Sequence, residues 1–147
     1  MPAAAERARL LIEQAEALGE SPEDPLLLFT VLYSFWVADF VRFNGDAMRE
    51  LAAKFLTLAG KQGASVPLMI GHRLMGSSLL CTGDIAEGRS HYDRALALYD
   101  PAEHRSLAMR FGDIRMAILS YRSQALWLLG YPEAALADTK NRVQFFP

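Results

Sequence analysis

Apolar residues recur along the chain at steps of three and four positions, which is the spacing of one face of an α-helix. No stretch keeps up the strict alternation of polar and apolar residues that marks a β-strand. The pattern therefore predicts an all-α fold of about seven helices. The helical spacing is clearest in three sets, which are Leu10, Leu11, Ala15 and Leu18; Leu51, Phe55 and Leu58; and Tyr92, Ala95, Leu96 and Tyr99.

Gly and Pro residues separate the predicted helices, because they end a helix or turn the chain. Three of the breaks share one order, in which an apolar helix is followed by a turn glycine and then by an amphipathic helix. A left-handed glycine lets the chain reverse tightly and lay the second helix antiparallel on the first. We expect Gly45, Gly83 and Gly130 to be these turn glycines.

The repeated order resembles the tetratricopeptide repeat, a helix–turn–helix unit of about 34 residues. The middle unit matches best, with the small residue Gly76 in its first helix and Pro101 at its end. The third unit has Ser123 at the small position and Ala135 where its helices cross, whereas the first unit carries Glu50 where a small residue is usual.

The resemblance implies that residues 1–147 form one domain of helix–turn–helix repeats stacked in a short right-handed superhelix. Its expected parts are a half repeat at 3–18, repeats at 26–60, 68–101 and 115–147, and an insertion at 102–114. Two phrases, at 98–112 and 125–136, are also similar to the carboxy-terminal tetratricopeptide part of bacterial adenylate or guanylate cyclase proteins that carry an ATPase-like module. This similarity implies a noncatalytic interaction or scaffolding module of a larger signalling protein. The single cysteine suits a reducing compartment, so we expect a cytoplasmic protein.

In tetratricopeptide arrays the first helices of successive units line a concave binding face. Tryptophan, tyrosine and arginine, which are enriched at binding hot spots, occur at the corresponding positions here. We therefore expect a protein or peptide to bind this groove. The alternative is that the tryptophans pack between helices and that the charged residues form a solvated ion cluster. The expected groove residues are Phe35, Trp36, Asp39, Arg42, Arg73, Ser77, Leu80, Tyr121, Gln124 and Trp127.

A second hypothesis is a sensor that holds a small molecule in the concave groove. Met69, Met75, Met109 and Met116 would line an adaptable pocket in such a sensor, because methionine side chains fill irregular spaces. The alternative for these methionines is ordinary core packing.

The insertion at 102–114 is longer than one turn requires and carries Arg105 and Arg110, with Arg115 following it. These arginines could meet an acidic partner or a phosphate. The alternative is that Leu107 and Phe111 fix a short helix over the repeat edge while the arginines stay in solvent.

The ends of the chain suggest a further contact, since the ends of a solenoid expose core surface. We expect a homodimer or partner contact there, through Leu10, Leu11, Phe145 and Phe146.

Composition and motifs argue against other classes of protein. Apolar residues make up 52% of the chain and the net charge is −2, which argues against disorder and leaves no basic surplus for nucleic acid. The most apolar stretch, at 25–41, is shorter than the roughly 20 residues of a membrane span. The lone Cys81 cannot form an intramolecular disulfide. The histidines lack the spacing of metal ligands and no catalytic motif is present, so we expect no metal, no cofactor and no enzymatic activity.

Overall fold

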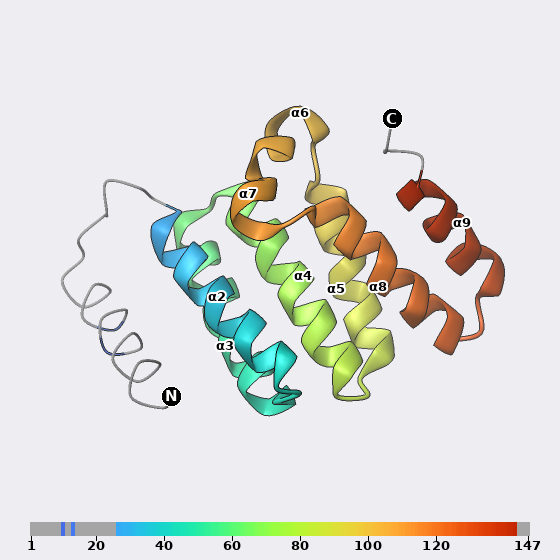
Figure 1. The fold of residues 1–147 in the computed structure, drawn as a ribbon, viewed down its shortest axis with the longest axis horizontal. Coiled ribbons are helices and arrows are strands. Elements are labelled where there is room, and N and C mark those ends of the chain that lie inside the picture. The colour runs from blue at the N-terminus through green and yellow to red at the C-terminus, as the bar shows by residue number, and fades with distance from the viewer. Residues whose placement is uncertain (1–9, 11–12, 14–25, 144–147) are drawn as a thin grey trace.

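The computed structural model describes residues 10, 13 and 26–143 of the chain (Figure 1). Within these residues the secondary structure is entirely helical, which confirms the predicted all-α class. The half repeat expected at 3–18 lies almost wholly outside the described residues. The long helices are α2 (Leu27–Val41), α3 (Gly45–Gln62), α4 (Ser65–Cys81), α5 (Ile85–Leu98), α8 (Ile114–Leu128) and α9 (Pro132–Val143). Between α5 and α8 lie the short elements α6 (Pro101–His104), η1 (Arg105–Leu107) and α7 (Ala108–Phe111).

The long helices form three helix–turn–helix pairs that stand side by side, namely α2–α3, α4–α5 and α8–α9 (Figure 1). Neighbouring pairs pack directly on one another, because α3 contacts α4 and α5 contacts α8. The first helices are also in contact, α2 with α4 and α4 with α8. Each pair therefore covers one face of the pair before it.

The turns inside the three pairs share one backbone geometry. In each turn an N–H group bonds to the carbonyl oxygen five residues earlier, the hydrogen bond of a Schellman motif. The three bonds run from Asn44 to Asp39 (3.0 Å), from Asp84 to Leu79 (2.9 Å) and from Tyr131 to Leu126 (2.8 Å). The residue before each donor has a positive φ, which is 57° at Phe43, 95° at Gly83 and 89° at Gly130. Phe43, Gly83 and Gly130 are therefore equivalent positions.

The prediction that Gly45 is the first turn glycine is wrong. The left-handed position belongs to Phe43, and Gly45 is the first residue of α3. A Cβ atom on Gly45 would lie 2.5 Å from Cγ2 of Thr82, so this glycine is needed for close contact with the next turn along the stack. The correction shifts the first pair by two residues. Trp36 is then equivalent to Gly76, and Met48 takes the crossing position that was assigned to Glu50.

The core runs through the stack and holds the insertion in place. Phe29 and Phe55 lie at its centre, with ring centroids 4.8 Å apart. Phe111, from the insertion, is fully buried and meets the Tyr33 ring edge-on at 5.4 Å, and Leu107 packs against the same core. Arg105 and Arg110 are exposed. Phe111 and Leu107 thus fix the short helical insertion, as the alternative interpretation expected, whereas Arg115 is half-buried and does not lie wholly in solvent.

No helix among the described residues has the length and apolarity needed to cross a membrane.

Candidate functional site

Three of the expected groove residues, Trp36, Ser77 and Arg73, are buried, and the expectation that they line an open surface is wrong. Trp36 is 4% exposed, and its Nε1–H donates to Oγ of Ser78 at 2.9 Å. Ser77 is also buried, with its Oγ 2.7 Å from the hydroxyl oxygen of Tyr92. In the corrected register Trp36 is equivalent to Gly76, which lies at a helix crossing against Gly88 and Tyr92 of α5. Burial also raises the pKa of the Tyr92 hydroxyl, so this group stays protonated and able to donate.

Arg73 was expected in the groove or in a solvated ion cluster, and both expectations are wrong. Its side chain is buried between α4 and the insertion. The Nη1–H group donates to the carbonyl oxygen of Phe111 at 2.9 Å, and the guanidinium carbon lies 5.6 Å from the centre of the Tyr33 ring. Arg73 therefore fixes the insertion to the stack.

The remaining groove residues are divided between core and surface. Phe35, Leu80 and Tyr121 are half-buried and pack against the core, where Tyr121 meets the ring of Phe40. Asp39 is half-buried and Arg42 is exposed. Gln124 and Trp127, both on α8, are exposed and share one cavity.

The four methionines do not form a common pocket. Met69 is fully buried in the core, whereas Met109 is 96% exposed on the insertion. Met75 packs against the core, and Met116 is partly exposed on α8. The interpretation of these residues as one ligand pocket is wrong, because they lie in separate environments.

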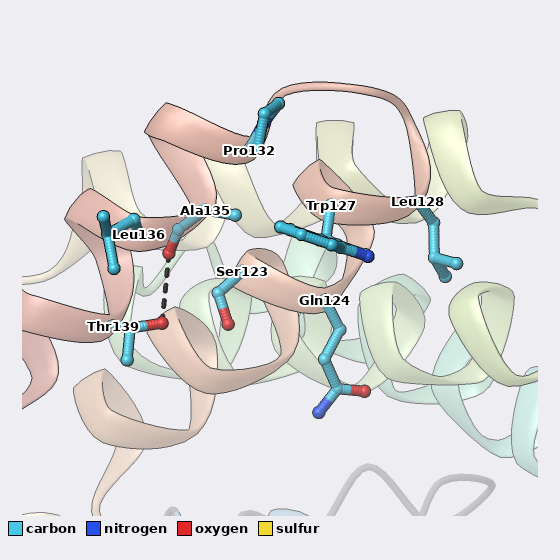
Figure 2. A pocket seen from close by; sticks show the side chains of 8 residues that line it. All are labelled: Ser123, Gln124, Trp127, Leu128, Pro132, Ala135, Leu136 and Thr139. Atoms are coloured by element: carbon cyan, nitrogen blue, oxygen red, sulfur yellow. Dashed lines mark hydrogen bonds between the residues drawn. The ribbon is translucent and has the colours of Figure 1, made fainter.

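The candidate site is an open cleft of about 440 Å³ between α8 and α9 (Figure 2). Figure 2 shows the Trp127 indole on α8, with Leu136 and Thr139 projecting from α9. Trp127 is 64% exposed and Leu136 is 54% exposed, so the cleft presents large apolar side chains to solvent. Its lining residues are Ser123, Gln124, Trp127, Leu128, Pro132, Ala135, Leu136 and Thr139.

Sequence reasoning missed most of the α9 wall of this cleft. We expected exposed core surface at the end of the chain, but assigned it to Phe145 and Phe146, which lie outside the described residues together with Leu11. Leu10 is described and exposed. The available signal was Leu136, an apolar residue next to Ala135 in the predicted amphipathic helix after Gly130.

The positions in the cleft have covered equivalents in the pair before. Counted from the turn residues, Gln124 corresponds to Ser77 and Thr139 corresponds to Tyr92. Ser77 and Tyr92 are buried where α8 packs against α4 and α5. Trp127 corresponds in the same way to Leu80, which packs against the core. The cleft on the α8–α9 pair is therefore equivalent to the face of the α4–α5 pair that α8 covers.

Ionic contacts hold α9 in place and so fix the shape of the cleft. The Arg122 guanidinium lies 2.9 Å from Oδ2 of Asp138 on α9 and 3.4 Å from Oδ1 of Asp93 on α5. Burial raises the pKa of Asp138, while the charge of Arg122 acts in the opposite direction. Arg115 and Arg142 add two further bonds between α8 and α9, to the carbonyl oxygen of Asn141 and to Oγ of Ser120, each at 3.3 Å.

The chemistry offered by the cleft is burial of apolar surface with a few neutral hydrogen bonds. None of the 8 side chains that line it is acidic or basic. Elsewhere, Nδ1 of His72 lies 2.9 Å from Nδ1 of His91. Across the described part of the chain, no group of three or more His, Cys, Asp or Glu is placed to hold a metal ion.

No family model matches the sequence, and neither a curated protein nor a solved structure is significantly similar to it. The resemblance to tetratricopeptide repeats and to the carboxy-terminal part of bacterial adenylate or guanylate cyclase proteins therefore stays a prediction.

Proposed function

We propose that the protein is a noncatalytic interaction module of tetratricopeptide type, in which the α8–α9 cleft binds an amphipathic helix of a protein partner. One observation carries the proposal. The cleft positions are covered by a helix in the α4–α5 pair, whereas Trp127 and Leu136 are exposed in the α8–α9 pair. A helix is the element that this face accepts elsewhere in the same stack.

The energetics favour such an occupant. Covering most of the exposed Trp127 indole removes on the order of 120 Å² of apolar surface from water, which is worth about 3 kcal/mol. Leu136 adds a second apolar contact, and Gln124 supplies a neutral hydrogen-bonding group at the rim. Because the lining carries no charge, the contacting face of the partner helix should be apolar and uncharged.

The proposal extends to the place of this module in the cell. The phrases at 98–112 and 125–136 support a position at the regulatory end of a larger, cyclase-related signalling protein. The low number of cysteines supports a cytoplasmic protein. In this setting the cleft would dock the module within a regulatory assembly.

A selection with helical peptides tests the proposal. A phage-displayed library of amphipathic helices as long as α8 is selected against the wild-type chain, and binding is then measured for Trp127→Ser and Leu136→Ser. We expect selected peptides to bind the wild type and to lose at least about tenfold in affinity for both variants, since one hot-spot side chain contributes more than 1.4 kcal/mol.

Met109→Ser is the matched control, because Met109 is an exposed apolar residue outside the cleft. Peptides that bind all four proteins equally would overturn the proposal, as would a selection without binders. Light scattering tests whether a second copy of the chain occupies the cleft. A wild-type dimer that Trp127→Ser dissociates would assign the cleft to a second copy of the chain instead of a partner.

A further inference from the structure

A second cavity, of about 310 Å³, lies between the insertion, the start of α8 and the end of α9. It shares no lining residue with the α8–α9 cleft. Three arginines from three different elements line it, Arg105 from η1, Arg115 from α8 and Arg142 from α9. The chain folds so that these cations, distant in the sequence, meet around one space.

Among the described residues, two carboxylates, those of Asp113 and Glu103, lie at or beside this cavity. Asp113 lines the cavity, but its Oδ1 accepts the backbone N–H of Met116 at 2.9 Å and so caps α8. Glu103 lies close by with a largely exposed side chain. Arg115 also interacts electrostatically with Asp138 on α9.

His104 lines the cavity and carries a buried ring nitrogen without a hydrogen-bond partner. The side chain is 3% exposed, and its Nδ1 accepts the backbone N–H of Asp100 at 2.8 Å. The proton of the imidazole must then be on Nε2, which is buried and has no hydrogen-bond partner. The nearest carboxylate oxygen, Oε2 of Glu103, is 3.7 Å away, beyond hydrogen-bond distance. Such a donor indicates a missing acceptor, since leaving it unpaired is costly.

Two of the arginines are held in position by the protein. Arg142 donates from Nη1 to Oγ of Ser120, and Arg115 donates from Nη1 to the carbonyl oxygen of Asn141. Both side chains are half-buried, which strengthens their attraction for an anion relative to solvent-exposed arginines. The amino-terminal end of the 15-residue helix α8 adds a partial positive charge.

We propose that this cavity binds a phosphoryl group, either as free inorganic phosphate or as the phosphomonoester of a small molecule. A single arginine satisfies a carboxylate with two parallel bonds, whereas a phosphoryl group offers three oxygens to donors from different directions. Arg105, Arg142 and the Nε2–H of His104 are such donors. Tyr99 and Met116 also line the cavity and provide apolar contacts for the organic part of a phosphomonoester.

Thermal unfolding at constant ionic strength tests the proposal, with inorganic phosphate, phenyl phosphate or chloride as the added anion. We expect both phosphates, but not chloride, to raise the melting temperature. Tighter binding of phenyl phosphate would identify a phosphomonoester as the ligand class, and equal binding would identify inorganic phosphate. The Trp127→Ser variant alters only the helix-binding cleft, so phosphate should raise its melting temperature as much as that of the wild type. Failure of one proposal is therefore distinguishable from failure of the other.

Arg105→Gln and Arg142→Gln should each weaken phosphate binding by about tenfold, the effect of one charge-assisted hydrogen bond. Arg42→Gln is the matched control, since it removes the same charge from an exposed position on the α2–α3 turn. The ¹⁵N resonance of His104 Nε2 should shift when phosphate binds to the wild type. Equal weakening by Arg42→Gln, an unmoved His104 resonance or the same melting temperature in phosphate and chloride would overturn the proposal.

Discussion

The backbone of Gly88 in α5 lies directly against the backbone of Gly76 in α4. A Cβ atom on Gly88 would stand 3.0 Å from the carbonyl oxygen of Gly76 and 3.2 Å from the backbone nitrogen of Leu80. Both neighbours are main-chain atoms, so a side chain at this point requires the helices to move apart. The glycine pair therefore sets the distance between α4 and α5.

Gly88→Ala should destabilise the fold by about 1–3 kcal/mol, the usual cost of overpacking, although alanine favours a helix by about 1 kcal/mol. Urea unfolding followed by circular dichroism measures the change. Gly60→Ala is the control, because Gly60 lies in α3 with open space around it, and it should stabilise the protein by about 0.5–1 kcal/mol. A Gly88→Ala protein as stable as the wild type would contradict the tight crossing.

Ser78→Ala should cost about 1–3 kcal/mol, because it leaves the buried indole N–H of Trp36 without an acceptor. Trp36→Phe removes the donor, so the double variant should lose less stability than the sum of the two single variants. Chemical unfolding of the wild type, the two single variants and the double variant measures the coupling free energy between Trp36 and Ser78. The Ser78 hydroxyl also donates to the carbonyl oxygen of Leu74 in its own helix. Ser34→Ala controls for the loss of that bond, because the exposed Ser34 hydroxyl donates to the carbonyl oxygen of Thr30 in the same way. Strictly additive losses would contradict a direct interaction between Trp36 and Ser78.

Arg122→Met should loosen α9, because it leaves the buried Asp138 without its cation, a loss on the order of 3 kcal/mol. Amide hydrogen exchange should show faster exchange along α9, with α3 and α4 still protected. Arg49→Met is the control, since Arg49 on α3 pairs with Asp84 and both side chains are largely exposed to solvent. Unchanged protection of α9 in the Arg122→Met protein would refute the role assigned to this ion pair.

Stability should fall between neutral and mildly acidic pH because of the His72–His91 pair. Burial, followed by the charges of His91 and Arg94, lowers the pKa of His72 to about 4, and burial also lowers the pKa of His91. The unfolded chain therefore binds protons at a higher pH than the folded one. Full stability is present above about pH 6.5 and is lost progressively as the pH falls toward 4.

Urea unfolding at several pH values measures this loss, and replacement of both histidines by phenylalanine should remove most of it. A double variant with the wild-type pH dependence would show that other groups cause the loss.

The fold class was predictable from the sequence because helical spacing and turn residues agree along the chain. The register of the first pair was not, because the left-handed turn position is occupied by Phe43, a residue type for which a positive φ is unfavourable. Local propensity points to Gly45 instead. Only the hydrogen bonds of the folded turn show which residue takes that conformation.

The register error also explains why the candidate site was only partly predicted. Trp36 and Trp127 were both expected on the concave face, yet Trp36 is buried at a helix crossing and Trp127 lies on the open face. Arg73 could not be assigned either, since its partner is a backbone carbonyl of the insertion rather than a side chain. Such contacts depend on tertiary packing and leave no pattern in the sequence.

The central claim, that the α8–α9 cleft receives a helix, is tested most directly by the two indole N–H signals in a ¹H–¹⁵N NMR spectrum. The chain has two tryptophans, and the Trp127→Phe variant assigns the signals. When a selected helical peptide is added, the Trp127 signal should shift to saturation, while the Trp36 signal, bonded to Ser78, should stay in place. A Trp127 signal that does not move at saturating peptide would contradict the account.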